Sequence, residues 1–263
     1  MHLSGRRPTR LRFDLMAKLS KTPSKTTNQR LVLTARGLVK RYGDAVALGG
    51  LDLDLRSGEC VAVIGHNGSG KTTAMRILAG LMEPSEGSVK IKGIDVHKAR
   101  GNPITRSAIS FAPDNPVLYD DLTVEEHLIL TGLAHGVSDD LDDRIDRVLD
   151  DLGLLSRRDY LPSQLSRGMR QKTSIACALI RPLEVLMLDE PVVGLDPPSQ
   201  RLLKEEIGSL VADEVAVLLT THQIEFARGI ADRVIVLDNG EMVDQGLFDE
   251  VVGGEKTAVL GLV

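Results

Sequence analysis

The stretch Gly65-His66-Asn67-Gly68-Ser69-Gly70-Lys71-Thr72 fits the phosphate-binding loop pattern G-x-x-x-x-G-K-[ST] at every fixed position. The apolar run before it, residues 60–64, predicts a short buried strand. The residues after it, 73–81, predict a helix whose apolar face carries Ala74, Ile77, Leu78 and Leu81. A strand, a glycine-rich loop and a helix in this order present backbone N–H groups to a phosphate chain. The stretch therefore predicts a nucleotide site rather than a plain glycine-rich turn.

Each fixed residue of this loop has a chemical role. Its glycines let the backbone approach a phosphate, because a Cβ would collide with it. Lys71 supplies a positive charge for the β- and γ-phosphates, and the Thr72 hydroxyl can ligate Mg²⁺. The predicted nucleotide contacts are the consecutive residues Gly65, His66, Asn67, Gly68, Ser69, Gly70, Lys71, Thr72 and Thr73.

The composition is that of an ordinary globular protein. The 263 residues are 42% hydrophobic and 26% charged, which is enough to build a sizeable core. The formal net charge of −5 argues against nucleic acid as a general partner. Cys60 and Cys177 are far apart, so we expect two small buried side chains rather than a disulfide or a metal site. No run approaches the ~18 apolar residues that span a bilayer, so work at a membrane would require docking onto something else there.

The first thirty residues differ from the remainder of the chain. Lysines and arginines greatly outnumber the single acid, Asp14, and apolar periodicity is weak. We predict a disordered basic extension over residues 1–30 and a globular domain over 31–263. The extension lacks the apolar segment of a signal peptide. Three interpretations stay open: a solvated tail without a role, a true start at Met16, or a tether to anionic lipid.

The predicted secondary structure changes along the globular part. It begins with short apolar or alternating runs that predict an antiparallel, strand-rich region, at 31–35, 46–48, 51–55 and 89–91. Helical spacing follows at 123–134 and 139–152, and we predict a helical insertion over about 120–182. Thr123 and Glu126 form a capping-box signature. The acids that open the second helix suit a solvated helix N-terminus better than a metal site; they are Asp139, Asp140, Asp142 and Asp143.

Strands and helices alternate elsewhere in the chain. Predicted strands lie at 109–112, 185–188, 215–219, 234–237 and 242–243. Predicted helices lie at 197–211 and 223–228. The expected fold is therefore α/β, with a mixed, mainly parallel core sheet flanked by helices, an N-terminal antiparallel β subdomain and an inserted α-helical subdomain.

Two carboxylates end the apolar strand at 185–188. Ligands of open α/β sheets bind at the carboxyl ends of the strands, so Asp189 and Glu190 should lie beside the phosphate-binding loop. Asp189 would hold Mg²⁺ directly or through water, and Glu190 could accept a proton from an attacking water. An acidic turn without a function is the alternative, and the neighbouring loop makes it the weaker one.

The most specific resemblance comes from Leu165-Ser166-Arg167-Gly168-Met169-Arg170-Gln171. This run is similar to the signature motif L-S-G-G-Q of the ATP-binding subunits of ABC transporters, and the likeness covers about residues 31–248. The resemblance implies that the signature acts in trans, on ATP bound to the loop of a second subunit. The residues in that role would be Ser166, Arg167, Gly168 and Met169, at the start of a helix predicted over 169–180.

Three further positions match the family one by one. Tyr42 stands where the family places an aromatic side chain that stacks on adenine. Asp196, within the run 194–197, resembles the D-loop that connects the two sites of the dimer. His222, after a strand at 217–221, matches the switch histidine that contacts the γ-phosphate. Glu190 and His222 are therefore the expected catalytic residues.

The chain also departs from the family pattern. Asp114 occupies the position of the Q-loop glutamine, where it can still ligate Mg²⁺ but adds a negative charge. The expected metal ligands are thus Thr72, Asp114 and Asp189. Arg167 replaces the first signature glycine, Met169 replaces the glutamine, and the D-loop has Val193 where serine is common. We expect Val193 to weaken a hydrogen bond across the dimer rather than abolish activity, and Asp114 to keep the metal-sensing role with an altered Mg²⁺ dependence.

The resemblance implies an Mg²⁺-dependent ATPase that powers transport. Its expected partners are a membrane-spanning subunit and a second ATP-binding subunit, and its expected place is the cytoplasmic face of the membrane as a peripheral protein. The sequence from 111 to 128 resembles the corresponding segment of ABC-2-type exporters. This favours export, although import stays open. Two alternatives remain: a soluble ABC ATPase of DNA repair or translation, and a catalytically weak ATP-binding regulator.

Overall fold

The computed structural model describes residues 29–254. The basic extension predicted for residues 1–30 therefore lies outside the described residues, apart from Gln29 and Arg30. Within the described range, no helix combines the length and the apolar character needed to cross a bilayer.

The N-terminal sheet is antiparallel, as the sequence predicts. Its strand order is β2-β1-β4-β5, formed by β1 (Leu31–Tyr42), β2 (Ala45–Arg56), β4 (Glu86–Ile91) and β5 (Ile94–Asp95). The two strands predicted at 46–48 and 51–55 are wrong as separate elements, because they form the single strand β2. The first strand is also much longer than the predicted 31–35. Register shifts between β1 and β2 interrupt its apolar alternation.

The core sheet is mainly parallel and has the order β10-β9-β3-β8-β7-β6. Only the edge strand β10 runs antiparallel to its neighbour. Its strands are β3 (Cys60–Ile64), β6 (Ile109–Ala112), β7 (Val185–Asp189), β8 (Ala216–Thr221), β9 (Arg233–Asp238) and β10 (Glu241–Leu247). Every residue of β3, β7 and β8 is buried, which explains their continuous apolar sequences. The predicted mixed core sheet is confirmed.

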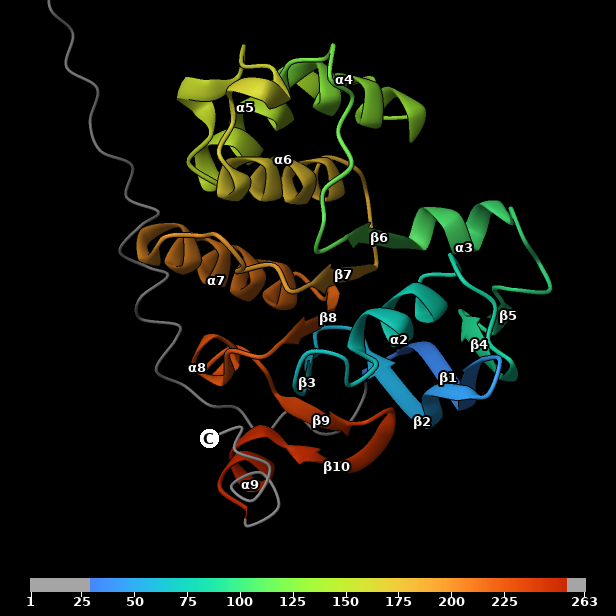
Figure 1. Cartoon of the computed structure of the whole chain (residues 1–263). Coiled ribbons are helices and arrows are strands. Elements are labelled where there is room, and N and C mark those ends of the chain that lie inside the picture. Colours follow the sequence, from blue (N-terminus) through green and yellow to red (C-terminus); the bar gives the residue numbers. More distant parts are fainter. Residues whose placement is uncertain (1–28, 255–263) are drawn as a thin grey trace, which may run out of the picture.

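The helices surround this sheet (Figure 1). They are α2 (Lys71–Leu78), α3 (Pro103–Ala108), α4 (Val124–Ala134), α5 (Leu141–Asp151), α6 (Arg167–Leu179), α7 (Pro197–Ala212), α8 (Ile224–Ala227) and α9 (Phe248–Val252), with short 3-10 turns at Leu155–Arg157 and Pro162–Gln164. Figure 1 shows α4, α5 and α6 packed together beyond β6 and β7, away from the N-terminal sheet. The chain between β6 and β7 is thus helical, as the sequence predicts.

Several helix boundaries differ from the predicted ones. The helix α2 ends at Leu78, and Leu81 is 64% exposed rather than part of its apolar face. The helix α6 begins at Arg167, two residues before the predicted start. The helix α3 was not predicted at all, although the side chain of Asn102 caps it and Pro103 occupies its first turn.

The N-termini of α4 and α5 follow the predicted chemistry. The Thr123 hydroxyl accepts a bond from the Glu126 N–H, and the Glu126 carboxylate accepts one from the Thr123 N–H. Asp142 and Asp143 lie in the first turn of α5, where the helix dipole favours negative charge. No three His, Cys, Asp or Glu side chains in residues 29–254 form a metal-binding group.

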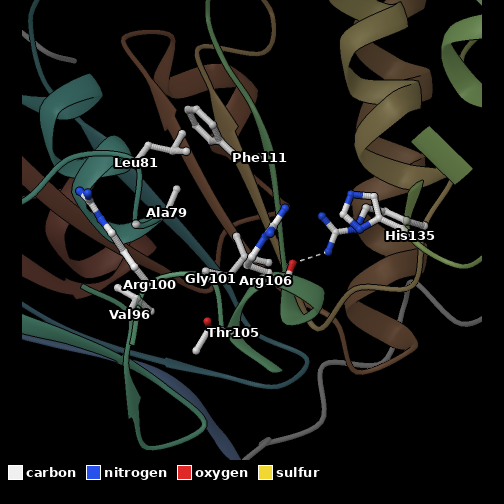
Figure 2. Close-up of a pocket in the computed structure, with 12 residues that line it drawn as sticks. Ala79, Leu81, Val96, Arg100, Gly101, Thr105, Arg106, Phe111 and His135 are labelled. Atoms are coloured by element: carbon white, nitrogen blue, oxygen red, sulfur yellow. Dashed lines mark hydrogen bonds between the residues drawn. The ribbon is translucent and has the colours of Figure 1, made fainter. Parts of the chain in front are cut away.

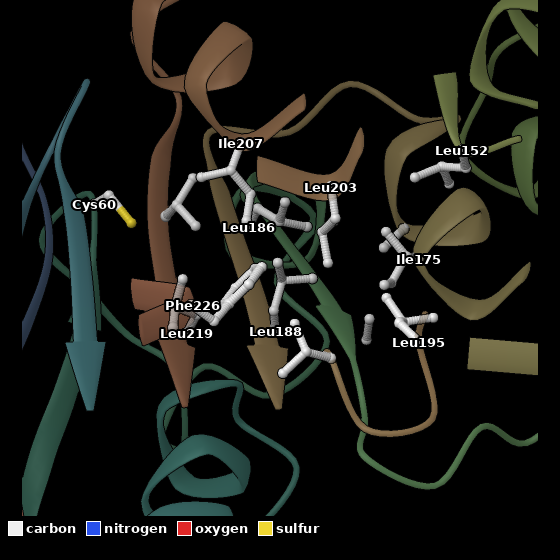
Figure 3. Close-up of a cluster of buried hydrophobic side chains, with 14 of the residues drawn as sticks. Cys60, Leu152, Ile175, Leu186, Leu188, Leu195, Leu203, Ile207, Leu219 and Phe226 are labelled. Carbon is white, nitrogen blue, oxygen red and sulfur yellow. The ribbon is translucent and has the colours of Figure 1, made fainter. Parts of the chain in front are cut away.

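The core sheet separates two apolar clusters. On one face, alternate side chains of β3, β7 and β8 pack against helices of the insertion and of the C-terminal half. Figure 3 shows Leu203 and Ile207 of α7 against Leu186 and Leu188 of β7. On the other face, the intervening side chains pack on α2 and the N-terminal sheet. Because both faces are covered, polar groups gather where the parallel strands end.

Candidate functional site

The phosphate-binding loop wraps around the ammonium group of Lys71. Lys71 is the first residue of α2 and is only 5% exposed. Its Nζ donates to the carbonyl oxygens of Gly65, at 2.8 Å, and His66, at 3.1 Å. The backbone of β3, the loop and α2 therefore form the strand–loop–helix unit that the sequence predicts, with one buried positive charge at its centre.

The glycines of the loop are required for two separate reasons. At Gly65 a Cβ would fall inside contact distance of the Leu237 carbonyl oxygen and of the Ser69 hydroxyl. At Gly70 it would meet the Ala47 carbonyl oxygen, and the φ of +101° also disfavours any other residue. Contacts with the chain itself therefore require glycine at these two positions. The expected approach of a phosphate is a separate reason for the glycines of the loop.

The remaining loop residues differ in exposure. His66 and Asn67 are exposed, and Thr73 is half-buried in the first turn of α2. Ser69 is buried, and its hydroxyl finds no hydrogen-bond partner in the described part of the chain. Backbone N–H groups and hydroxyls at this helix N-terminus suit a phosphate chain.

Asp189 lies at the end of β7 and is 1% exposed. Its Oδ1 accepts a hydrogen bond of 2.6 Å from the Thr220 hydroxyl of β8. Burial raises the pKa of the Asp189 carboxyl, and hydrogen bonds from Thr220 and Thr72 oppose that rise. The structure thus brings Thr72 and Asp189 together, and their oxygens are the donors that Mg²⁺ prefers.

Glu190 is held between the loop lysine and the switch histidine. Its Oε1 lies 3.2 Å from Lys71 Nζ, and its Oε2 lies 2.9 Å from His222 Nδ1. Its backbone has a φ of +46°, a conformation that few non-glycine residues adopt, and its N–H donates to the Thr220 hydroxyl. His222 keeps 41% of its side chain exposed, whereas the Glu190 side chain is 9% exposed. The predicted catalytic pair is therefore adjacent in the structure.

Thr220 is a site residue that the sequence analysis missed. Its hydroxyl donates to Asp189 and accepts from the Glu190 N–H, so it fixes both carboxylates relative to β8. In the sequence, Thr220 is marked only by the pair Thr220-Thr221 at the end of an otherwise apolar strand. This pair indicates a site residue only once β8 is known to pair with β7, which places Thr220 beside Asp189.

The signature residues begin α6. The Ser166 hydroxyl caps the helix by accepting from the Met169 N–H at 3.2 Å. A Cβ at Gly168 would collide with the Gly194 carbonyl oxygen, so the signature packs closely against the predicted D-loop. Asp196 caps α7 by accepting from the Ser199 N–H, and hydrogen bonds from Ser199 lower its pKa.

The two main departures from the family pattern face each other. Asp114 Oδ1 lies 4.0 Å from a guanidinium nitrogen of Arg167. The negative charge of Asp114 also contributes to the raised pKa of Asp189, so it acts on the predicted magnesium ligands. Gln171, another residue with no predicted role, joins α6 to the same loop by donating to the Pro113 carbonyl oxygen at 3.2 Å.

Tyr42 ends β1 with an accessible ring. It is 52% exposed, its hydroxyl lies 3.0 Å from Met82 Sδ, and Lys40 Nζ lies 5.2 Å from the ring centroid. An exposed aromatic face of this kind can stack on a base. The adenine contact itself stays a prediction.

Comparison with known families and proteins gives a consistent picture. The family described as ABC transporter matches residues 48–193. The Nod factor export ATP-binding protein I of Sinorhizobium fredii is 37% identical over 227 residues, covering 84% of this chain and 66% of the relative. The daunorubicin resistance ATP-binding protein DrrA3 of Streptomyces coeruleorubidus is 37% identical, covering 87% and 73%. This chain thus spans about two thirds to three quarters of these relatives.

A relative of more similar length and a solved structure agree with this result. The ABC-type transporter ATP-binding protein EcsA of Bacillus subtilis is 33% identical, covering 84% of this chain and 89% of the relative. A solved ATP-binding subunit of an ABC transporter superimposes with a TM-score of 0.77 at 33% identity, covering 88% and 94%. The phosphate-binding loop, the paired carboxylates and the matched fold lead to one conclusion: the chain belongs to the ABC transporter family, among its ATP-binding subunits.

Proposed function

We propose that this protein hydrolyses ATP to power export of a substrate across a membrane through a separate membrane-spanning partner. The observation that carries the proposal is the position of Glu190, whose two carboxylate oxygens lie beside Lys71 and His222. The names of the relatives support export, since they include Nod factor export and daunorubicin resistance proteins.

The described residues suit in-line attack of water on the γ-phosphate. Lys71 would exchange its contact with Glu190 for the β- and γ-phosphates, leaving one carboxylate oxygen free. Glu190 would then accept a proton from the attacking water, while His222 orients the carboxylate and senses the γ-phosphate. Mg²⁺, held by Thr72 and Asp189, would neutralise charge that develops on the phosphate oxygens.

A second ATP-binding subunit completes the proposed site. Ser166 and Gly168 lie at the N-terminus of α6, which favours negative charge, so they could bind the γ-phosphate held by the partner. Arg167 and Met169 would flank that contact, and Asp196 would link the two sites. ATP would close the dimer and hydrolysis would reopen it.

The membrane-spanning partner would dock on the helical insertion, with the protein at the cytoplasmic face of the membrane. The loop at 114–119 would relay the state of the γ-phosphate to that surface. Its Asp114 charge contributes to the raised pKa of Asp189, and the carbonyl oxygen of the preceding residue, Pro113, accepts a hydrogen bond from Gln171 of α6. We further propose that Asp114 ligates Mg²⁺ together with Thr72 and Asp189.

One observation favours a different function, that of a catalytically weak ATP-binding regulator. The Asp114 carboxylate and the Arg167 guanidinium approach within 4.0 Å, so each could hold the other away from nucleotide. The intact arrangement of Lys71, Glu190 and His222 favours the enzyme.

Phosphate release from ATP and Mg²⁺ by the purified full chain separates these functions. We expect the wild type to be active and Glu190→Gln to be slower by about a hundredfold or more, because the substitution removes the general base. Glu190→Gln should still bind a fluorescent ATP analogue, which controls for unfolding. An inactive wild type would favour the regulator, and a fully active Glu190→Gln would remove Glu190 from the mechanism.

A further inference from the structure

The short helix α8 closely follows the switch histidine. It begins at Ile224, two residues after His222, and contains only four residues. A helix of this length is not stable by itself, because forming its first turn fixes several residues for a single hydrogen bond. The Gln223 side chain makes no capping bond at its N-terminus. Other contacts must therefore hold α8, and through it the segment that carries His222.

Burial of apolar side chains is one of these contacts. Ile224, Phe226 and Ala227 are at most 5% exposed and belong to the apolar cluster on one face of the core sheet. Figure 3 shows Phe226 beside Leu219 of β8. This burial holds α8 against the sheet. Because the hydrophobic effect is non-directional, it does not by itself fix the direction in which the helix points.

Lys204 of α7 supplies a directional contact at the C-terminal end of α8. Its Nζ donates to the carbonyl oxygens of Glu225, at 3.0 Å, and Arg228, at 3.1 Å. The last carbonyl groups of a helix lack partners within the helix, and a positive charge beside them is favourable. The same Nζ lies 5.4 Å from the centroid of the Phe226 ring. One side chain thus makes three contacts that fix the end of α8 on α7.

The two backbone carbonyls are the only hydrogen-bond partners of the Lys204 ammonium in the described part of the chain. Lys204 forms no ion pair within residues 29–254, and the acid near it, Glu225, pairs with Arg228 at 3.2 Å. Lys204 is half-buried, and burial lowers the pKa of its ammonium, opposed by the charge of Glu225. Partial burial of an unpaired cation is unfavourable, so the bonds to α8 are the contacts that offset it.

The helix α7 gives Lys204 a rigid support. Leu203 and Ile207, on either side of it in the sequence, are at most 1% exposed and pack on the core sheet. The helix begins at the predicted D-loop, where the Asp196 carboxylate caps it. Lys204 therefore joins the segment after His222 to the helix that starts at the D-loop.

His222 has few other contacts that set its position. Its Nδ1 lies 2.9 Å from Glu190 Oε2, and its backbone N–H donates to the same oxygen at 3.3 Å. Both contacts end on one carboxylate oxygen, so neither fixes His222 independently of Glu190. The next residue, Gln223, donates its N–H to the Thr221 hydroxyl at 2.9 Å and leads directly into α8. The orientation of α8 therefore bears on the position of the His222 ring.

We propose that Lys204 is a positioning residue for the switch histidine. It fixes the end of α8 on α7 and thereby holds the His222 ring against Glu190. The inference rests on the proposed function, in which His222 orients the Glu190 carboxylate. A misplacement of about 1 Å at a catalytic group can slow a reaction by about a hundredfold. Binding of nucleotide to the phosphate-binding loop does not depend on this contact.

Three substitutions in the full chain test the proposal. Lys204→Met removes the ammonium and keeps an apolar stem, whereas Lys204→Arg keeps a cation with several N–H donors. Arg100→Met controls for the loss of a cation outside α7 and α8. Figure 2 shows Arg100 with Val96 and Gly101 in the wall of a separate hollow, and its guanidinium pairs with Glu83 at 3.3 Å. The measurements are single-turnover phosphate release from ATP and Mg²⁺, with enzyme in excess, and the affinity for a fluorescent ATP analogue.

Lys204→Met should release phosphate about tenfold more slowly and should bind the analogue within about twofold of the wild-type affinity. Lys204→Arg should recover most of the rate, and Arg100→Met should match the wild type. In a His222→Ala background, Lys204→Met should cause no further loss, because no ring is left to position. A merely structural role of Lys204 would slow the reaction by the same factor with or without His222.

Equal rates of Lys204→Met and the wild type would overturn the inference and leave the proposed function intact. The same holds for an equal fold-loss in the His222→Ala background, for a Lys204→Arg variant as slow as Lys204→Met, and for a tenfold loss of affinity for the analogue. A wild-type chain that releases no phosphate would overturn both the inference and the proposed function.

Discussion

Glu190 shows at the scale of one residue how the fold prepares a catalytic group. Its φ of +46° is unfavourable for a side chain with a Cβ, and the hydrogen bond from its N–H to Thr220 helps to hold that conformation. The same hydroxyl satisfies buried Asp189. One threonine on β8 thus fixes two carboxylates that are proposed for different tasks.

Asp114 gives a prediction at this scale. Asp114→Gln removes a negative charge that raises the pKa of Asp189, so Mg²⁺ should be attracted less strongly. We expect phosphate release to need roughly threefold more Mg²⁺ for half-maximal rate, as for a loss of under 1 kcal/mol of attraction. The measurement is a magnesium titration of phosphate release.

Asp139→Asn is the matched control, because Asp139 is an exposed acid of the helical insertion. Its titration should coincide with that of the wild type. A curve for Asp114→Gln that coincides as well would exclude a role of Asp114 at the metal.

The phosphate-binding loop and the acidic strand end predicted Lys71, Asp189 and Glu190 from the sequence, and the family resemblance predicted His222. Thr220 could not be identified in this way. Its role depends on the pairing of β7 with β8, and those strands are separated by α7 in the sequence. Residues at a fixed spacing within one motif can be found in a single sequence. Residues that meet only because distant segments pair in the fold cannot.

At the scale of elements, the close contact between the start of α6 and the predicted D-loop depends on a glycine. Gly168→Ala would place a methyl group inside contact distance of the Gly194 carbonyl oxygen, which is backbone and cannot rotate away. We expect a loss of about 1–3 kcal/mol in the free energy of unfolding. Denaturant unfolding of the full chain measures it.

Gly208→Ala is the control for that experiment. Gly208 lies within α7, and a Cβ there would meet nothing within 4 Å. Alanine should therefore stabilise the helix, by roughly 0.5–1 kcal/mol. If Gly168→Ala were as stable as the wild type, the close contact between signature and D-loop would be wrong.

The packing of α7 predicts a pH dependence of stability. Burial, and then the charges of Asp151 and Asp213, raise the pKa of Glu206 from 4.5 to about 7. Between these values the folded chain binds a proton that the unfolded chain has released, so stability falls as the pH rises through this window. Above pH 7 both states are ionised and the full penalty remains.

Glu206→Gln should therefore be more stable than the wild type by about 2 kcal/mol at about pH 8, with the difference vanishing below about pH 4.5. Denaturant unfolding at several pH values measures this difference. Glu205→Gln, an exposed neighbour on α7, should show no comparable trend. A Glu206→Gln difference independent of pH would contradict the burial of an acid here.

Element types were more predictable than element boundaries. The strands β3, β6 and β7 match their predicted positions closely because they are short, mostly apolar and almost wholly buried segments. The predicted range for β1 was too short, because register shifts disturb the alternation on which the prediction depends. The predicted range for α2 was too long, although Gly80, with a φ of +74°, follows its last turn.

At the scale of the whole molecule, the catalytic cluster and the signature are separate features of one chain. The cluster of Lys71, Glu190 and His222 includes no signature residue, and the Ser166 hydroxyl is bonded within its own helix. This arrangement supports the proposed completion of each site by a second subunit.

The central claim is that this ATPase serves a membrane-spanning partner. The most direct test is affinity purification of the tagged full chain from gently solubilised membranes of its native host, with the retained chains identified by mass. The account predicts one multi-spanning membrane protein, recovered in proportion to the tagged chain. Recovery from the soluble fraction alone, with ribosomes, with DNA or with no partner, would contradict the account and favour an ABC ATPase outside transport.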